Sequence, residues 1–218
     1  MTGVATAPRR AYLLADAHRA ALDLRHDGLL TTIDLPARPP DGRVSVVALE
    51  YDEKPVVETG LVARTVDGGY SLTHANLLSE SGERHAEAAA RGGTIPTHVT
   101  VDGSYASRWK VFVDRPGPVR VDASYGFQGE AGGGTLAVEM AGTVVEHGVS
   151  PTGQTVGEPN QSWHIDNFVS RLVGEVQIPE PGVYEVVLTL EATGPDPVKL
   201  QWLWLQPEGG PAAAPSPE

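Results

Sequence analysis

The sequence predicts an all-β protein built from many short antiparallel strands. Two stretches, VFVDRPGPVRVDASY (111–125) and VQIPEPGVYEVVLTL (176–190), each place a Pro-Gly pair between two runs of alternating apolar and polar residues. Such alternation is typical of strands with one buried face, and Pro-Gly favours a tight turn because Pro presets φ and Gly accepts positive φ. The candidate strands recur at roughly 8–12-residue spacing, which favours a β-sandwich or barrel.

The overall composition supports this fold class and excludes several functions. The chain has 25 Gly and 18 Pro, which supply turns, and a net charge of −12. A negative surface argues against binding to nucleic acid or to an anionic membrane surface. No apolar run approaches the ~20 residues of a membrane-spanning helix, and no signal peptide is visible, so the sequence favours a cytoplasmic protein without fixing the compartment. The absence of Cys excludes disulfides and cysteine-based zinc sites and catalysis.

The N-terminal part of the sequence is predicted to form only part of a domain. Residues 1–10 are expected to be a disordered start, and residues 11–54 a partial antiparallel β segment. A few short strands bury little apolar surface, so we expect this segment to need a second layer from elsewhere. Its candidate strands are AYLLAD (11–16), LDLRHDG (22–28), LLTTIDLP (29–36) and VSVVALEYDE (44–53).

Residues 55–207 are predicted to form the main β domain, and residues 208–218 a disordered tail or the start of a linker. One helix is expected within the domain, over SGERHAEAAARGG (81–93) with Ser81 as its cap, and a mobile loop is the alternative interpretation. The candidate strands are separated by Gly-rich and Pro-containing turns and comprise residues 61–66, 69–74, 96–101, 108–114, 118–125, 135–140, 143–149, 163–169, 171–178, 183–191 and 198–206.

The last candidate strand, VKLQWLWLQP (198–207), is apolar on both faces. We therefore expect this strand to be central and covered twice, or to lie against another domain. Its two Trp residues are interpreted as core or interface residues for the same reason. Strict alternation divides the apolar side chains of this strand into one face with Val198, Leu200, Trp202 and Trp204 and an opposite face with Leu203 and Leu205.

No constellation of catalytic residues is visible. The sequence lacks the G-x-S-x-G motif of many serine hydrolases, and GEAGGG (129–134) lacks the Lys and Ser/Thr of a phosphate-binding loop. The 28 acidic residues lie mostly at turns or at outward strand positions, where a solvated surface explains them. His85 and Glu87 would point to different faces of a helix, so we predict no metal site between them and His98 or His164.

The order of motifs along the chain resembles part of a known enzyme family. Residues 11–53, with YLL, LP, PPD and VVALE in that order, resemble the end of the β-sandwich that follows the catalytic barrel in bacterial α-L-fucosidases of glycoside hydrolase family 29. Three later segments resemble the additional C-terminal jelly-roll domain of some of these enzymes, which is similar to carbohydrate-binding modules of the galactose-binding-like fold. These segments are DGGYSLTHANLLSESG (67–82), SYASRWKVFVDRPGPVRVDASYGF (104–127) and SWHIDNFVSRLVGEVQIPEPGVYEVVLTL (162–190).

The resemblance covers most of residues 11–207 and implies both a fold and a function. The fold would be a galactose-binding-like jelly-roll β-sandwich preceded by a short partial β-sandwich segment. Catalysis in that family sits in a (β/α)-barrel of roughly 250 residues with alternating strands and helices. No such pattern is present, so no catalytic residue carries over and the chain is predicted not to be an enzyme on its own.

Two functions follow as expectations. The first is a non-catalytic accessory region of an α-L-fucosidase-like glycoside hydrolase, which would support the catalytic barrel and bind carbohydrate, with a fucosylated glycan as the implied ligand. The alternative is a free-standing carbohydrate-binding or protein-interaction β-sandwich module. Carbohydrate-binding jelly rolls often hold a structural Ca²⁺. Their early acidic pair is replaced here by THAN (73–76), so no cofactor is predicted, although Asp166 and Asn167 remain candidate calcium ligands.

A sugar site needs aromatic faces for stacking and polar side chains at the rim. Trp109 alternates with Val111 and Val113 and is interpreted as a core residue. Aromatic residues beside loops have a better claim to exposure, and on this basis we predict that Tyr105 and Phe127 are accessible. Trp163 follows a polar loop and could either stack on a ligand or begin a strand as a core residue. The predicted carbohydrate-binding surface consists of Tyr105, Phe127, Asn160 and Trp163.

Overall fold

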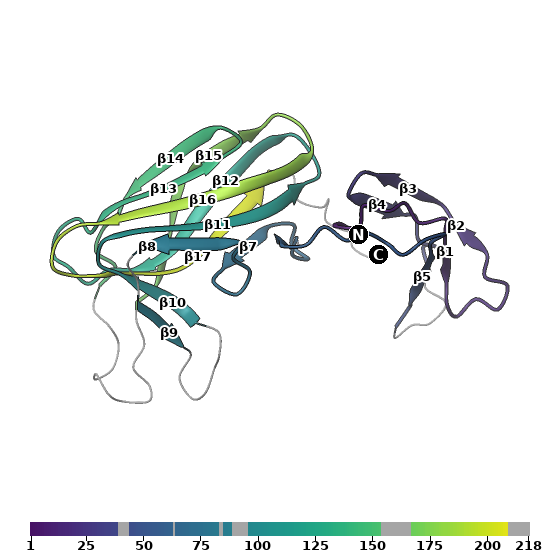
Figure 1. The fold of residues 1–218 in the computed structure, drawn as a ribbon, viewed down its shortest axis with the longest axis horizontal. Helices are drawn as coiled ribbons and strands as arrows, with labels where there is room; N and C mark the ends of the chain where they lie inside the picture. The colour runs from purple at the N-terminus through teal and green to yellow at the C-terminus, as the bar shows by residue number, and fades with distance from the viewer. Residues whose placement is uncertain (39–43, 63, 83–84, 89–95, 154–166, 209–218) are drawn as a thin grey trace, which may run out of the picture. The chain divides into compact units, whose positions relative to one another are not determined.

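The structure is a computed structural model, and it describes residues 1–38, 44–62, 64–82, 85–88, 96–153 and 167–208. The chain divides into two compact units, Met1–Leu61 (unit 1) and Val62–Glu218 (unit 2). All regular elements within the described ranges are β-strands, which confirms the predicted all-β class (Figure 1). In this part of the chain, no helix is long and apolar enough to cross a membrane.

Unit 1 contains two small antiparallel sheets. One has the order β2-β1-β5, built from Ala21–Leu22, Arg10–Leu13 and Val47–Glu50. The other is a hairpin of β3 (Leu24–Asp27) and β4 (Leu30–Ile33). β3, β4 and β5 fall within the predicted strands 22–28, 29–36 and 44–53, whereas β1 and β2 each begin one residue before a predicted range, at Arg10 and Ala21.

Residues 1–10, for which we predicted a disordered start, make main-chain hydrogen bonds in the structure. The Met1 amino group donates a hydrogen bond of 2.8 Å to the carbonyl oxygen of Thr31, and Gly3 N–H donates to Leu29 at 2.9 Å. Ala5 N–H donates to the carbonyl of Val56 at 2.8 Å. The first residues are therefore held between two distant segments by main-chain hydrogen bonds, which depend on no side-chain pattern and so leave no trace in the sequence.

Unit 2 is a sandwich of two antiparallel sheets, as the sequence predicted (Figure 1). The first, which we call the β17 sheet, has the order β15-β12-β17-β10-β9, with β7 paired to β17 beside β10. Its central strand β17 contacts β12 along almost its whole length. The strands of this sheet are β7 (Tyr70–Thr73), β9 (His85–Ala88), β10 (Pro96–Val101), β12 (Gly117–Gly126), β15 (Val169–Ile178) and β17 (Val198–Pro207).

The second sheet of unit 2, the β16 sheet, has the order β14-β13-β16-β11-β6, with β8 also paired to β11. Its long central pair is β11 with β16, which stays in register from Ser104↔Glu191 to Val113↔Gly182. The strands of this sheet are β6 (Leu61–Val62), β8 (Ser79–Gly82), β11 (Ser104–Val113), β13 (Gly134–Met140), β14 (Thr143–Gly148) and β16 (Gly182–Ala192).

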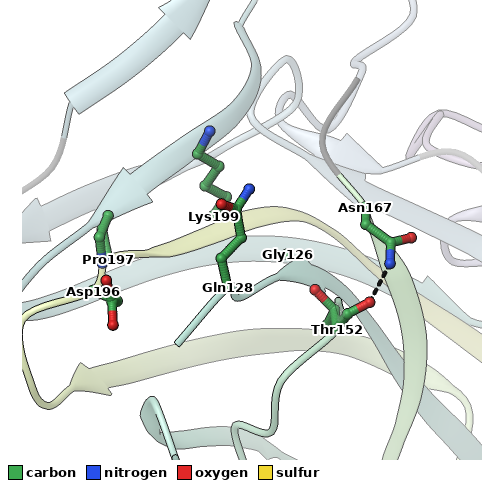
Figure 2. A pocket seen from close by; sticks show the side chains of 7 residues that line it. All are labelled: Gly126, Gln128, Thr152, Asn167, Asp196, Pro197 and Lys199. Carbon is green, nitrogen blue, oxygen red and sulfur yellow. Dashed lines mark hydrogen bonds between the residues drawn. The ribbon is translucent and has the colours of Figure 1, made fainter. Parts of the chain in front are cut away.

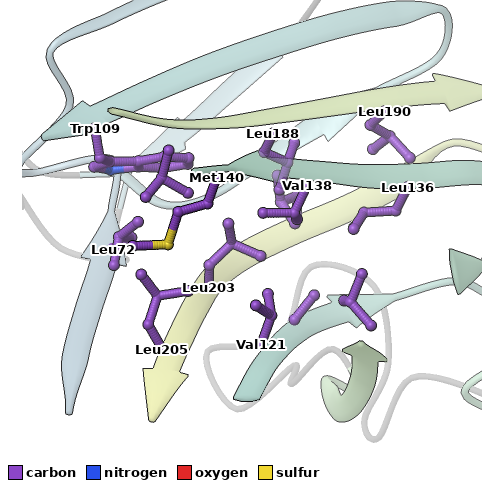
Figure 3. Packing of buried hydrophobic residues seen from close by; sticks show 14 of the residues in the cluster. Leu72, Trp109, Val121, Leu136, Val138, Met140, Leu188, Leu190, Leu203 and Leu205 are labelled. Carbon is purple, nitrogen blue, oxygen red and sulfur yellow. The ribbon is translucent and has the colours of Figure 1, made fainter. Parts of the chain in front are cut away.

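The core lies between these two sheets and consists of their inward-facing residues. Leu188 and Leu190 of β16 face Val121 of β12 and Leu203 of β17, and all four are completely buried (Figure 3). Trp109 is 1% exposed, and its indole N–H donates to the carbonyl of Thr73 at 2.9 Å, which confirms its interpretation as a core residue. Alternation along each strand therefore supplies one face to the core and leaves the other as an outer surface.

The helix predicted over residues 81–93 is wrong in the described part. Ser79–Gly82 forms β8, which pairs with β11, and His85–Ala88 forms β9, which pairs with β10. Gly82 has φ +107°, and a Cβ there would lie 2.1 Å from the carbonyl oxygen of Ser104. This contact requires glycine and a non-helical backbone, so strand pairing overrides the local helical propensity of the sequence.

The facial assignment of the last strand also needs correction. Ser124 pairs with Trp202, but Tyr125 pairs with Leu200, so Gln201 is an extra residue in a β-bulge. The bulge shifts the alternation by one position. The buried face consequently contains Val198, Leu200, Leu203 and Leu205, each no more than 1% exposed, while Trp202 and Trp204 lie on the opposite, outer face and are half-buried.

Candidate functional site

Unit 2 has a cavity of about 110 Å³ at one end of the β17 sheet (Figure 2). It forms where the register pairs Gly126 at the end of β12 with Lys199 near the start of β17. Other walls come from the segment after β14 and from Asn167, two residues before β15 begins at Val169. The lining residues are Gly126, Gln128, Thr152, Asn167, Asp196, Pro197 and Lys199.

Thr152 fixes one wall of the cavity to the end of β12. Its N–H donates to the carbonyl of Phe127 at 2.8 Å, and its hydroxyl oxygen accepts the N–H of Phe127 at 2.9 Å. The Thr152 side chain is buried, so these bonds are shielded from water and hold the segment firmly. The wall therefore belongs to the framework of the sandwich although it lies between strands.

Asn167 is oriented by the same wall. Its side-chain amide donates a hydrogen bond to the carbonyl of Thr152 (Figure 2). The neighbouring Gly153 has φ +97°, and a Cβ there would lie 2.8 Å from the Asn167 amide nitrogen. Glycine at 153 thus permits the approach of the Asn167 amide group to the Thr152 carbonyl.

The cavity is lined by both neutral and charged hydrogen-bonding groups. Gln128 and Asn167 offer amides, Asp196 offers a carboxylate and Lys199 an ammonium group. Asp196 also borders an adjacent, more open hollow of about 350 Å³ between residues 127–132 and 193–196. Pockets that enclose a whole small molecule measure about 300–1,000 Å³. The smaller cavity therefore suits one polar portion of a ligand, and the neighbouring hollow extends the space available to it.

Two Trp residues lie on the outer face of the same sheet. The register places Lys199, Trp202 and Trp204 on this face of β17, beside Gly126, Ser124 and Asp122 of β12 respectively. Five residues of strand span on the order of 16 Å. The cavity and the two half-buried indoles therefore lie along the same outer face of β17, which we call the outer strip.

Polar pairs flank these indoles. Ser124 donates to the side-chain carbonyl of Gln201 at 2.8 Å. The Arg120 guanidinium donates two hydrogen bonds, of 2.7 and 2.8 Å, to the Asp122 carboxylate, and these bonds raise the pKa of Arg120. Aromatic side chains flanked by polar groups are what a sugar site needs. Here they are Trp202 and Trp204, which are not among the residues that the sequence predicted for such a site.

The structure buries two of the predicted site residues. Tyr105 is 2% exposed on the inner face of β11, and its hydroxyl donates to Glu80 at 3.0 Å. Phe127 is 3% exposed, with its ring against Gly129 and Gly133, where a Cβ would lie 2.3 and 2.9 Å from the ring atoms. The predicted exposure of both rings is therefore wrong, because position beside a loop does not prevent inward orientation. Asn160 and Trp163 lie outside the described residues.

The residues that do form the outer strip leave little local signal. Thr152, Asn167 and Asp196 come from separate connecting segments that only the sheet order brings together. Trp202 and Trp204 were visible, but simple alternation assigned them to the wrong face. The one cue available was SPTG (150–153), where a small polar residue precedes a glycine after a strand.

The candidate metal ligands are only partly described. His98 is buried with its ring centroid 5.3 Å from that of Phe168, and Asn167 lines the cavity. His164 and Asp166 lie outside the described residues. Within the described ranges no three His, Cys, Asp or Glu side chains come together as a metal-binding group.

Comparison with known proteins gives structural but no sequence matches. No protein-family model matches the chain, and no curated protein sequence matches it. The insecticidal crystal protein Cry2Aa matches 80% of this chain and 28% of its own length, with 11% identity and a TM-score of 0.50. At this identity the similarity describes the β-sandwich fold alone.

Two further solved structures match with lower TM-scores. The C-terminal CBM6 module of LamC, a marine laminarinase from Zobellia galactanivorans, matches over 64% of this chain and 99% of its own, with 17% identity and a TM-score of 0.46. An α-L-fucosidase from Vibrio sp. strain EJY3 matches over 95% of this chain, with 17% identity and a TM-score of 0.44. This chain spans about a third of that enzyme, 35% of its length.

Proposed function

We propose that unit 2 is a carbohydrate-binding β-sandwich and that its ligand lies along the outer strip. The observation that carries this proposal is that the polar cavity at Lys199 and the two half-buried indoles of Trp202 and Trp204 lie along one face of β17. Sugar hydroxyls both donate and accept hydrogen bonds, which suits a wall that offers amide, carboxylate and ammonium groups. The C–H faces of a sugar ring suit a flat aromatic platform.

The accessory role is the second part of the proposal. The sequence of residues 11–53 resembles the end of a fucosidase β-sandwich, and unit 1 exposes apolar side chains that its own sheets leave uncovered. Among these are Leu35 at 61%, Val44 at 68% and Val56 at 62% exposure. Exposed apolar groups in such a small unit favour a protein partner. We propose a catalytic barrel domain as that partner and a fucosylated glycan as the ligand of unit 2.

Ligand binding can be tested by affinity electrophoresis and calorimetry. We expect the protein to bind at least one member of a panel that includes a fucosylated polysaccharide, laminarin and xylan. Lys199→Ala and Trp202→Ala should each weaken binding about tenfold, whereas Val144→Ala, an exposed position on the β16 sheet, should not. If no panel member binds, or if all three variants bind like the wild type, the outer strip is not a carbohydrate site.

The accessory role has a separate test. We expect the reading frame upstream of the Met1 codon to continue and to encode alternating strands and helices of a (β/α)-barrel. A stop codon with its own ribosome-binding site would contradict the accessory role, and the free-standing module would then be the remaining function for a chain that binds glycan.

A further inference from the structure

The turn that precedes β7 is a rigid element beside the outer strip. Arg64 and Tyr70 form a β-bridge, and Thr65 N–H donates to the carbonyl of Gly69 at 2.8 Å. The Thr65 hydroxyl donates to the same carbonyl at 3.0 Å, and Gly68 N–H donates back to Thr65 at 3.0 Å. The Arg64 side chain adds a bond of 2.7 Å to the carbonyl of Gly68. Main-chain groups on both sides of Gly69 are therefore fixed.

Gly69 itself lies directly against the indole of Trp204. A Cβ at this glycine would lie 2.4 Å from Cζ2 and 2.7 Å from Cε2 of that ring, and 3.0 Å from the carbonyl oxygen of Leu205. Real Cβ atoms do not approach other carbon atoms so closely. The absence of a side chain at 69 is thus the condition for the present position of the ring. No positive φ is involved, so the requirement is for space alone.

A second contact fixes the same ring from its polar edge. The indole N–H of Trp204 donates a hydrogen bond of 3.0 Å to the side-chain carbonyl of Gln206, two residues along β17. A half-buried Trp with one edge against a fixed backbone and its N–H engaged has few alternative rotamers. Such a side chain loses little conformational entropy when a ligand stacks on it.

We propose that Gly69 is a positioning residue for ligand binding, which acts by seating the Trp204 indole in its stacking orientation on the outer strip. The inference rests on the proposed carbohydrate-binding function of that strip. It adds that the turn at residues 65–69, which does not line the cavity, sets the position of the Trp204 indole. Gly69→Ala should therefore change ligand affinity through the ring and not through the fold.

The position of the ring can be measured without any ligand. The indole N–H signal of Trp204 in a ¹⁵N–¹H correlation spectrum is assigned by its loss in Trp204→Phe. We expect Gly69→Ala to shift this signal while the signal of the core residue Trp109 stays in place. Gly148→Ala is the matched control, because a Cβ there meets no atom within 4 Å and its φ is not positive. An unshifted Trp204 signal in folded Gly69→Ala would overturn the proposal.

Binding of the best panel polysaccharide supplies the second readout. We expect Gly69→Ala to lose about tenfold in affinity, and Gly148→Ala to bind like the wild type. In the Trp204→Phe background, which lacks the fused bicyclic ring whose atoms make the contact, Gly69→Ala should cost at most about twofold more. Equal losses in both backgrounds would overturn the proposal. Absence of binding by the wild type would contradict the proposed function. The shift of the Trp204 indole signal would then be the remaining test of whether Gly69 positions that ring.

Discussion

Unit 1 and unit 2 are both all-β, but they bury apolar surface to very different degrees. In unit 2 the inner faces of two sheets form one buried cluster that includes Trp109, Tyr125 and Leu188. In unit 1 the buried apolar side chains of the described residues are those of Pro8, Ala11, Tyr12 and Leu13. Small sheets with so little buried surface are marginally stable alone. The difference teaches that unit 2 has a core of its own, whereas unit 1 buries little apolar surface.

The largest expected effect comes from matched leucine substitutions. Leu188→Ala in the core of unit 2 should lower the free energy of unfolding by about 2–5 kcal/mol, because it leaves a cavity between the sheets. Leu35→Ala in unit 1, where the side chain is 61% exposed, should change it by less than about 0.5 kcal/mol. Far-UV circular dichroism reports the strands of both units, whereas Trp fluorescence reports unit 2, which holds all four Trp residues. Denaturant unfolding followed by both signals therefore measures each variant in its own unit. Equal effects at the two positions would remove the contrast.

Glycine substitutions test the same contrast through the backbone. Gly134 of β13 has φ +118°, and a Cβ would lie 1.9 Å from the carbonyl oxygen of Glu191 on the paired strand. Gly134→Ala should therefore cost about 3 kcal/mol. Gly28 in unit 1 has φ +57° with no atom within 4 Å, so Gly28→Ala should cost only about 1 kcal/mol. Thermal unfolding would show this order, and a reversed order would argue against tight strand pairing in unit 2.

Acid should weaken the two units in different pH ranges. Burial, and then the charge of Arg171, lower the pKa of His147, which shares a hydrogen bond of 2.9 Å with the Tyr125 hydroxyl. The unfolded chain then binds the proton more readily, so this contribution to stability is complete above about pH 6.5 and is lost as the pH falls below it. His147→Gln should reduce the change in the free energy of unfolding of unit 2 between pH 7 and pH 5. Denaturant midpoints determined at several pH values across this range would measure it. An unchanged slope would contradict this assignment.

In unit 1 the comparable group is Asp16. Backbone N–H groups of Ala20 and His18 donate to its carboxylate at 2.8 and 3.0 Å and lower its pKa. Its contribution is present above about pH 3.9 and is lost as the pH falls further, toward the lowered folded value. On the basis of these two groups, unit 2 should begin to lose stability at a higher pH than unit 1. Amide hydrogen exchange at pH 5.5, compared with pH 7, would detect the order.

The smallest expected effect concerns a polar defect within the core of unit 2. Ser107 of β11 is completely buried, and its hydroxyl has no hydrogen-bond partner among the described residues. Ser107→Ala should leave stability unchanged or raise it by up to about 1 kcal/mol. Ser124→Ala is the matched change, because Ser124 is also buried but bonded to Gln201, and it should cost about 1 kcal/mol. A clear loss for Ser107→Ala would indicate a partner for this hydroxyl.

Much of the fold was predictable from the sequence, but little of the site was. Local alternation and Pro-Gly turns located β11, β12, β15 and β16, because a strand with one buried face imposes a period of two on its own residues. The helix at 81–93 was mispredicted because the backbone conformation of Gly82 is set by a close contact with Ser104, which is distant in the sequence. The exposure of Tyr105 and Phe127 was mispredicted because the direction of a side chain near a loop depends on which strand lies opposite.

By itself, the sequence determined the all-β class, the turn positions and the amphipathic strands, since these follow from propensities and periodicities within a few residues. Only the tertiary structure decided which faces met. The bulge at Gln201 moved Trp202 and Trp204 to the outer face, and pairing of β12 with β17 placed Gly126 beside Lys199. Long-range pairing also brought Gly69 against Trp204. Register and bulges are set by contacts between distant segments, so the outer strip exists only once the strands are paired.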